Sequence, residues 1–183
     1  MLENLLTWSQ LQRGRIEYDP GPLELRLLVE RTTNLLSKTA QTKQIRLEQT
    51  IANGLCVYAD EYMLDTVIRN LTCNALKFTP TGGQITISAR VADEQDGSGW
   101  VEVSVSDTGV GISLEDRDKL FKLEVHHTTP DTAQEKGTGL GLILCQEMVG
   151  KNGGKIWLES ADVPGQGTTV IFTVPLGSQP VGG

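Results

Sequence analysis

Residues 137–154 read GTGLGLILCQEMVGKNGG, with glycines at alternate positions directly before an apolar helical run. The run ends in the letters NGG, which are typical of a helix C-terminus. A helix N-terminus carries unpaired N–H groups and a partial positive charge, and Gly137, Gly139 and Gly141 allow the backbone to approach an anion closely. We therefore interpret the beginning of this helix as a phosphate cradle. The alternative is that the glycines only bend a loop.

This stretch departs from both common phosphate-binding fingerprints. The dinucleotide fingerprint requires a preceding strand and a glycine at its sixth position, but the segment before Gly137 is polar and the sixth position is Leu142. The phosphate loop of nucleotide hydrolases requires a Lys followed by Ser or Thr, and none follows. The sequence thus predicts an anion-binding helix outside those two folds.

The flanking segments alternate helices with pairs of strands. Helices are predicted from Pro22 to about Thr42 and from the N-cap Asp60 to just before Pro80. The order predicts an α/β fold, a two-layer sandwich of a mixed, mostly antiparallel sheet with about three long helices on one face. The predicted strand pairs are 45–51 with 55–59 as a hairpin across Asn53-Gly54, 84–91 with 100–107 as antiparallel neighbours, and 155–160 with 168–174.

Composition limits the classes of function. The chain has 183 residues, 38% of them apolar, and a net charge of −7, which indicates one globular domain without the basic surface that nucleic acid requires. Its three cysteines lack metal-ligand spacing and are interpreted as buried reduced thiols. No run reaches the length of a membrane span, so we expect a cytoplasmic domain without direct membrane contact, whose parent is soluble or membrane-anchored.

The predicted helix after Asp60 carries an unusual polar edge. Asn70, Asn74 and Lys77 are spaced four and three residues apart, so they share one side of the helix beside its apolar stripe. Asparagine is an indifferent helix former, and a carboxamide oxygen can bind Mg²⁺, which takes its other ligands from nucleotide phosphates and water. The alternative is a solvated polar edge.

A third feature is Asp107, which ends a predicted buried strand before Thr-Gly. A fixed carboxylate accepts a hydrogen bond from an exocyclic amine such as that of adenine, and it discriminates against a carbonyl in that place. The alternative is a simple turn stabilised by the aspartate side chain.

Four motifs occur in order: NLTCNALKFT (70–79), DTGVGI (107–112), GTGLGL (137–142) and GQGTT (165–169). These motifs resemble the N, G1, G2 and G3 boxes of sensor histidine kinases, which are members of the GHKL or Bergerat-fold ATPase superfamily. LFKLEV (120–125) stands where that family carries its F box. The resemblance covers about residues 16–176. It implies a protein histidine kinase domain that binds ATP and Mg²⁺ and transfers the γ-phosphoryl group to a histidine.

The resemblance also implies residue roles. Asn74 would ligate Mg²⁺, Asn70 and Lys77 would act near the phosphates, and Asp107 would read the adenine amine. Residues 115–136 would form the ATP lid. The implied nucleotide-binding residues are Asn70, Asn74, Lys77, Phe78, Asp107, Gly109, Gly111, Ile112, Gly137, Thr138, Gly139, Leu140, Gly141, Leu142 and Thr168.

Asn70 distinguishes two kinds of enzyme within this superfamily. Hydrolytic members resemble one another in carrying a Glu one turn before the Mg²⁺ asparagine, as the general base for water. An amide cannot accept that proton, so we expect slow hydrolysis and transfer of the γ-phosphoryl group to an acceptor. The alternatives are an ATPase that drives conformational change and a non-catalytic nucleotide-binding module.

The phosphoacceptor motif of the family has no counterpart here. The histidines present are His126 and His127, inside the expected lid. We therefore expect residues 1–15 to be the remnant of the second dimerisation helix, residues 16–176 to be the catalytic domain, and residues 177–183 to be a disordered tail. The expected partners are the phosphoacceptor-histidine dimerisation domain of a parent kinase and the receiver domain of a response regulator, with no nucleic acid.

Overall fold

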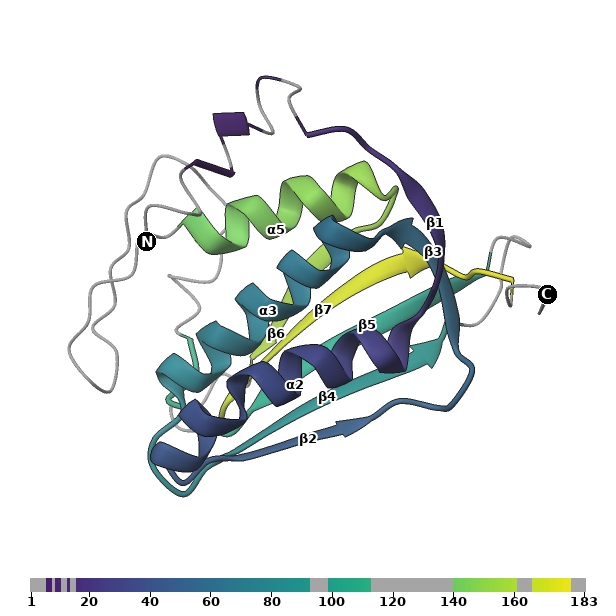
Figure 1. Ribbon diagram of the computed structural model, residues 1–183. Helices are drawn as coiled ribbons and strands as arrows, with labels where there is room; N and C mark the ends of the chain where they lie inside the picture. Colours follow the sequence, from purple (N-terminus) through teal and green to yellow (C-terminus); the bar gives the residue numbers. More distant parts are fainter. Residues whose placement is uncertain are drawn as a thin grey trace.

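The computed structural model describes residues 6, 7, 9, 10, 13, 16–92, 99–112, 140–160 and 166–178. Within these ranges the chain forms two layers (Figure 1), with α2 (Leu25–Thr42), α3 (Glu61–Phe78) and α5 (Leu140–Lys151) on one face of a five-stranded sheet. The strands run in the order β2 (Arg46–Thr50), β4 (Gln84–Val91), β5 (Trp100–Asp107), β7 (Thr168–Pro175) and β6 (Ile156–Ser160). The β2–β4 pair is parallel and the other neighbours are antiparallel, which confirms the predicted fold class.

A second, two-stranded sheet corrects two sequence predictions. It consists of β1 (Pro20–Glu24) and β3 (Cys56–Asp60), which run antiparallel with Pro22 opposite Tyr58. The prediction that Pro22 begins a helix is wrong, because Pro22 lies in β1 and α2 begins at Leu25. A proline fixes a φ that suits an edge strand as well as a helix start, so the pairing with β3 decided between them.

The predicted hairpin between residues 45–51 and 55–59 is also wrong. A turn does occur, with Gly54 at φ 73°, but β2 pairs with β4 and β3 pairs with β1. β3 is buried at both ends, in the pattern BBeBB, whereas β2 alternates in exposure. A strand covered on both faces belongs inside the molecule, and long-range contacts therefore overrode the local turn signal.

α3 follows the predicted signals closely. Asp60 is extended, and its carboxylate accepts a hydrogen bond from the N–H of Met63 at 2.9 Å, which caps the helix. The helix ends at Phe78, two residues before Pro80. α5 ends as the NGG letters predict, with Gly153 at φ 79° and the Gly154 N–H bonded to the carbonyl of Val149 at 3.0 Å.

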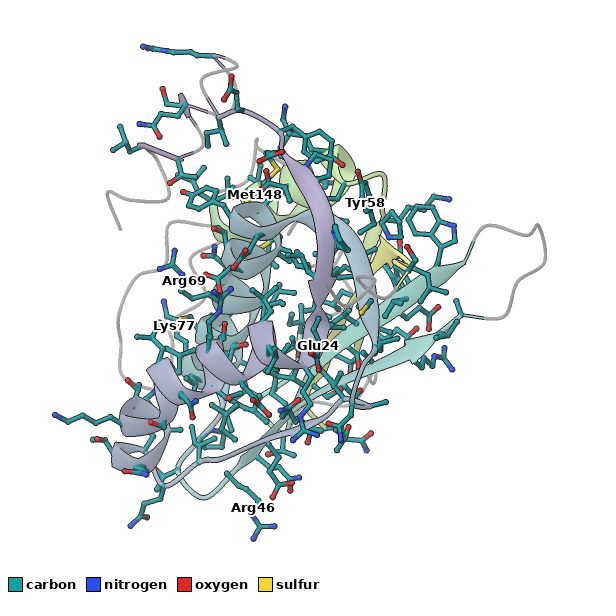
Figure 2. The ribbon with its side chains drawn as sticks, turned by 45° about the vertical axis from the view of Figure 1, so that its right-hand side comes forward. Glu24, Arg46, Tyr58, Arg69, Lys77 and Met148 are labelled. Atoms are coloured by element: carbon teal, nitrogen blue, oxygen red, sulfur yellow. The ribbon has the colours of Figure 1, made fainter. Side chains whose placement is uncertain are left out.

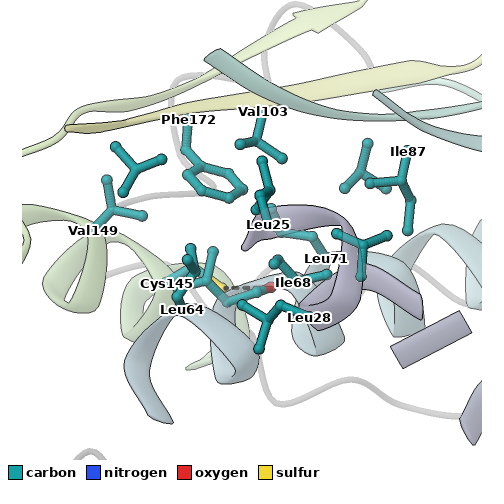
Figure 3. Close-up of a cluster of buried hydrophobic side chains, with 14 of the residues drawn as sticks. Leu25, Leu28, Leu64, Ile68, Leu71, Ile87, Val103, Cys145, Val149 and Phe172 are labelled. Carbon is teal, nitrogen blue, oxygen red and sulfur yellow. Dashed lines mark hydrogen bonds between the residues drawn. The ribbon is translucent and has the colours of Figure 1, made fainter. Parts of the chain in front are cut away.

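The core lies between the helices and the sheet. Figure 3 shows side chains of α3 and α5 facing side chains of the sheet. Burying such side chains contributes about 1.5–3 kcal/mol each, and this layer fixes the positions of the helix ends that matter below. Its members include Leu64, Ile68, Leu71, Ile87, Val103, Leu144, Cys145, Val149 and Phe172.

None of the helices in the described ranges has the length and apolar character needed to cross a bilayer.

Candidate functional site

α3 and α5 pack side by side and run in opposite directions. The Asp60 N–H donates to Asn152 Oδ1 at 2.8 Å, and the Cys145 thiol lies 3.9 Å from the Val67 carbonyl oxygen (Figure 3). Seven residues forward on α3 therefore correspond to seven residues backward on α5. Five residues forward from Val67 lead to Thr72 and five residues back from Cys145 lead to Leu140, so the first turn of α5 (140–143) lies level with residues 69–72 of α3.

The polar edge of α3 begins at this level and runs to the end of the helix. Asn70, Asn74, Lys77 and Phe78 are all half-buried. The Asn70 amide donates to the Thr66 carbonyl at 2.9 Å, and the Lys77 ammonium lies 5.5 Å from the centre of the Phe78 ring. The Asn74 carboxamide makes no hydrogen bond to another of the described residues. Figure 2 shows Lys77 toward one end of the helical layer and Met148 of α5 toward the other.

The loop after β5 is fixed against the end of α3. The Gly109 N–H donates to Asp107 Oδ1 at 2.7 Å, and the Val110 N–H donates to the Phe78 carbonyl at 3.3 Å. A Cβ on Gly109 would lie 2.6 Å from Asp107 Oδ1 and 2.6 Å from the Phe78 carbonyl oxygen, so only glycine fits between them. Asp107 and Phe78 are therefore neighbours although 29 residues separate them in the sequence.

The beginning of β7 closes the same corner. Thr168 lies opposite Asp107 in the β5–β7 register, and its backbone N–H is hydrogen-bonded to the Asp107 carboxylate. Gly167, at φ 76°, donates its N–H to the Gly109 carbonyl at 3.1 Å. The chain thus brings the second and fourth sequence motifs into direct contact.

Asp107 is held as a recognition group in a partly dehydrated place. Burial raises the pKa of its carboxyl above 3.8, while the N–H groups of Gly109 and Thr168 oppose that rise. Two backbone donors orient the carboxylate, and the sheet and the glycine loop prevent it from turning away. Such a carboxylate suits a ligand that supplies an N–H group.

The other predicted site residues fall into two groups. Gly111, at φ 75°, and Ile112 end the described part of the loop after β5, while Leu140, Gly141 and Leu142 form the first turn of α5. Gly137, Thr138 and Gly139, the expected lid at 115–136 and the F-box segment 120–125 lie outside the described residues.

Sequence reasoning missed two supports of the site. Thr108, within the second motif, accepts the Gln84 N–H on its hydroxyl at 2.9 Å and so joins the turn before β4 to the loop after β5. Asn152 was interpreted only as part of a helix end, yet it is 6% exposed and binds the start of α3. A buried asparagine side chain leaves no signal in hydrophobic periodicity.

Comparisons with known proteins agree on one family. Residues 59–178 match the model of the histidine kinase-, DNA gyrase B-, and HSP90-like ATPases. Over 177 residues the chain is 35% identical to histidine protein kinase DivJ of Caulobacter vibrioides, and over 177 residues it is 41% identical to adaptive-response sensory kinase SasA of Rippkaea orientalis. Each alignment covers 96% of this chain, but only 28% of DivJ and 43% of SasA. The chain therefore spans less than half of the length of either relative.

Solved structures show the same likeness. The nucleotide-free catalytic domain of histidine kinase ThkA superposes with a TM-score of 0.71 at 29% identity, over 86% of this chain and 98% of that domain. Full-length ShkA in complex with AMPPNP gives a TM-score of 0.78 at 26% identity, over 97% of this chain and 35% of ShkA.

Proposed function

Since this chain belongs to the family of histidine kinase-, DNA gyrase B-, and HSP90-like ATPases, we propose that it is the ATP-binding catalytic domain of a sensor histidine kinase. In this proposal it binds Mg-ATP and transfers the γ-phosphoryl group to a histidine outside the chain. The observation that carries the proposal is the contact of the Asp107 loop with the end of α3, the helix that bears the amide edge and packs antiparallel to α5.

The adenine end is assigned to Asp107 and its surroundings. The carboxylate accepts a hydrogen bond from the exocyclic amine, and the backbone N–H groups of Gly109 and Thr168 orient it. Phe78 packs beside the base, with Gly111, Ile112 and Thr168 around it. GTP has a carbonyl where ATP has the amine, so two acceptors would face each other and GTP would be rejected.

The phosphate end is assigned to α3 and α5. The N-terminus of α5, which lies alongside α3, is assigned to supply partial positive charge and N–H groups to the phosphates. Lys77 supplies a positive charge, and Gly137, Thr138, Gly139, Leu140, Gly141 and Leu142 are proposed to wrap the phosphates.

The donor set of α3 fits Mg²⁺. Asn74 offers a half-buried carboxamide oxygen, and hard oxygen ligands with nucleotide phosphates are what Mg²⁺ prefers. When bound, the metal would neutralise charge that develops on the phosphate oxygens. Asn70 lies one turn before Asn74 and is assigned to the phosphates. Its amide cannot act as a base toward water, so the phosphoryl group is kept for the acceptor.

In the transfer itself, the bond from the γ-phosphorus to the β–γ bridging oxygen breaks, a phosphorus–nitrogen bond forms at an imidazole, and ADP leaves. Partner molecules follow from this chemistry: a dimerisation domain that carries the acceptor histidine, and a receiver domain that takes the phosphoryl group from it. The relatives are sensor kinases much longer than this chain.

Nucleotide titration tests the proposal. Mg-ATP should stabilise the protein by about 2.7 kcal/mol at a hundredfold excess over its dissociation constant, and chelation of Mg²⁺ should weaken binding. Asn74→Ala should abolish the Mg²⁺-dependent part of the affinity, whereas Asn34→Ala, on an exposed position of α2, should not. A separately produced histidine-bearing dimerisation fragment should become labelled from γ-labelled ATP at histidine.

Three results contradict the proposal in different ways. No stabilisation by Mg-ATP would favour a non-catalytic module. Rapid ATP hydrolysis without any acceptor would favour a conformational ATPase and contradict the argument from Asn70. Unchanged Mg²⁺ dependence in Asn74→Ala would remove the metal assignment.

A further inference from the structure

Three segments meet at a buried hydrogen-bond network far from the proposed nucleotide site. Asp60 is 5% exposed and Asn152 is 6% exposed. Asp60 accepts the N–H of Met63 on one carboxylate oxygen and the N–H of Asp19 on the other, both at 2.9 Å. Its own N–H donates to Asn152 Oδ1 at 2.8 Å, and Asn152 Nδ2 donates to the Met148 carbonyl at 2.9 Å. We call Asp19, Asp60 and Asn152 the aspartate clamp.

The aspartate clamp lies at the opposite end of α3 and α5 from the phosphate assignment. Asp60 precedes α3 and Asn152 follows α5, whereas Asn74 is near the end of α3 and Leu140 begins α5. Because the two helices are antiparallel, one bond at the clamp joins the far ends of both. The amide of Asn152 is the part of the clamp that belongs to α5.

We propose that Asn152 is a positioning residue for the nucleotide site: it holds the end of α5 on the start of α3 and thereby fixes where the first turn of α5 lies along α3, level with Asn70. This inference rests on the proposed function. Asn152 touches no nucleotide, and it acts through the orientation of a rigid helix.

The geometry of α5 explains how loss of the Asn152 hydrogen bonds at its C-terminal end displaces its first turn. The helix has 12 residues, so it is about 18 Å long, and Cys145 contacts α3 near its middle. A tilt of about 5° about that contact would move Leu140, about 7.5 Å away, by roughly 0.65 Å. Phosphate contacts depend on displacements of this size, whereas the adenine end is built on β5, β7 and the end of α3, none of which is part of α5.

Asn152→Ala tests the proposal through a ratio of two affinities. The dissociation constants of Mg-ATP and of adenosine are measured by calorimetry in the cold, where the protein stays folded. The variant should lose about tenfold in affinity for Mg-ATP while its affinity for adenosine stays within about twofold. Leu28→Ala is the control, because it removes a side chain that is 3% exposed on α2 and destabilises the fold without touching the clamp. Its affinity ratio should equal that of the wild type.

A second variant keeps the test decisive. Asn152→Leu fills the same space without hydrogen bonds, so it should show the same selective loss even where Asn152→Ala folds poorly. An unchanged ratio in either folded variant, or an equal loss in Leu28→Ala, overturns the inference. If the wild-type protein itself fails to bind Mg-ATP, the proposed function falls first, and that result is distinct from an unchanged ratio in a wild type that binds.

Discussion

Gly167 passes so close to Asp107 that a Cβ on the glycine would lie 1.8 Å from the Asp107 carbonyl oxygen. Gly167 also has a φ of 76°, which side chains other than glycine rarely adopt. The contact joins the end of β5 to the beginning of β7 and so holds the carboxylate opposite Thr168. The proposed adenine site therefore requires a residue without a Cβ at position 167.

Gly167→Ala should therefore damage both stability and binding. Neither backbone can move without breaking the β5–β7 register, so we expect a loss of more than about 2 kcal/mol in the free energy of unfolding and much weaker adenosine binding. Urea unfolding and calorimetry measure the two effects. Gly150→Ala is the matched control: a Cβ there meets nothing within 4 Å in the last turns of α5, so it should be neutral or stabilise by up to about 1 kcal/mol. A folded Gly167→Ala variant with wild-type affinity would contradict the argument.

Asp107→Asn should change selectivity more than stability. Burial opposes the charge of Asp107, and the amide removes that cost while its oxygen still accepts a backbone N–H. We expect the free energy of unfolding at pH 7 to stay within about 1 kcal/mol and the preference for ATP over GTP to fall by at least about tenfold. Asp65→Asn, on α3, is the control. Retained selectivity in Asp107→Asn would remove Asp107 from the adenine site.

Adenosine affinity should depend on pH in the acidic range. The pKa of the Asp107 carboxyl is raised above 3.8 by burial in the free protein, and an amine donating to the carboxylate favours its ionised form, so binding lowers that pKa and releases a proton. Affinity should be full above the raised pKa and fall by up to about tenfold per pH unit below it. Titrations at several pH values measure this fall, and Asp107→Asn should flatten it. An equal slope in both proteins would assign the effect to another group.

Cys145 and Cys73 should respond differently to truncation. Cys145 is fully buried against Val67, and burial raises its pKa, whereas Cys73 is exposed on α3, so its interpretation as a buried thiol is wrong. Cys145→Ala should cost about 1–2 kcal/mol and Cys73→Ala less than about 0.5 kcal/mol, as measured by thermal or urea unfolding. Equal costs would show that the α3–α5 contact at Cys145 contributes little to stability.

Local patterns in the sequence predicted the helices well because their signals lie within a few residues. The cap Asp60, the apolar stripe of α3 and the NGG end of α5 each depend on neighbours along the chain, and each was confirmed. The antiparallel pair β4–β5 followed from alternation in the same way. The predictions for Pro22 and for the 45–59 hairpin failed, because several pairings satisfied the same local signal.

The sequence by itself determined the family, through four ordered motifs, and with it the chemistry expected of Asn74 and Asp107. Only the tertiary structure decided which distant segments touch: Gly109 between Phe78 and Asp107, Gly167 across Asp107, and Asn152 on Asp60. The physical reason is that motif residues carry their chemistry in their own side chains. The contacts that position them depend instead on backbone paths and buried hydrogen bonds between segments 29 to 92 residues apart.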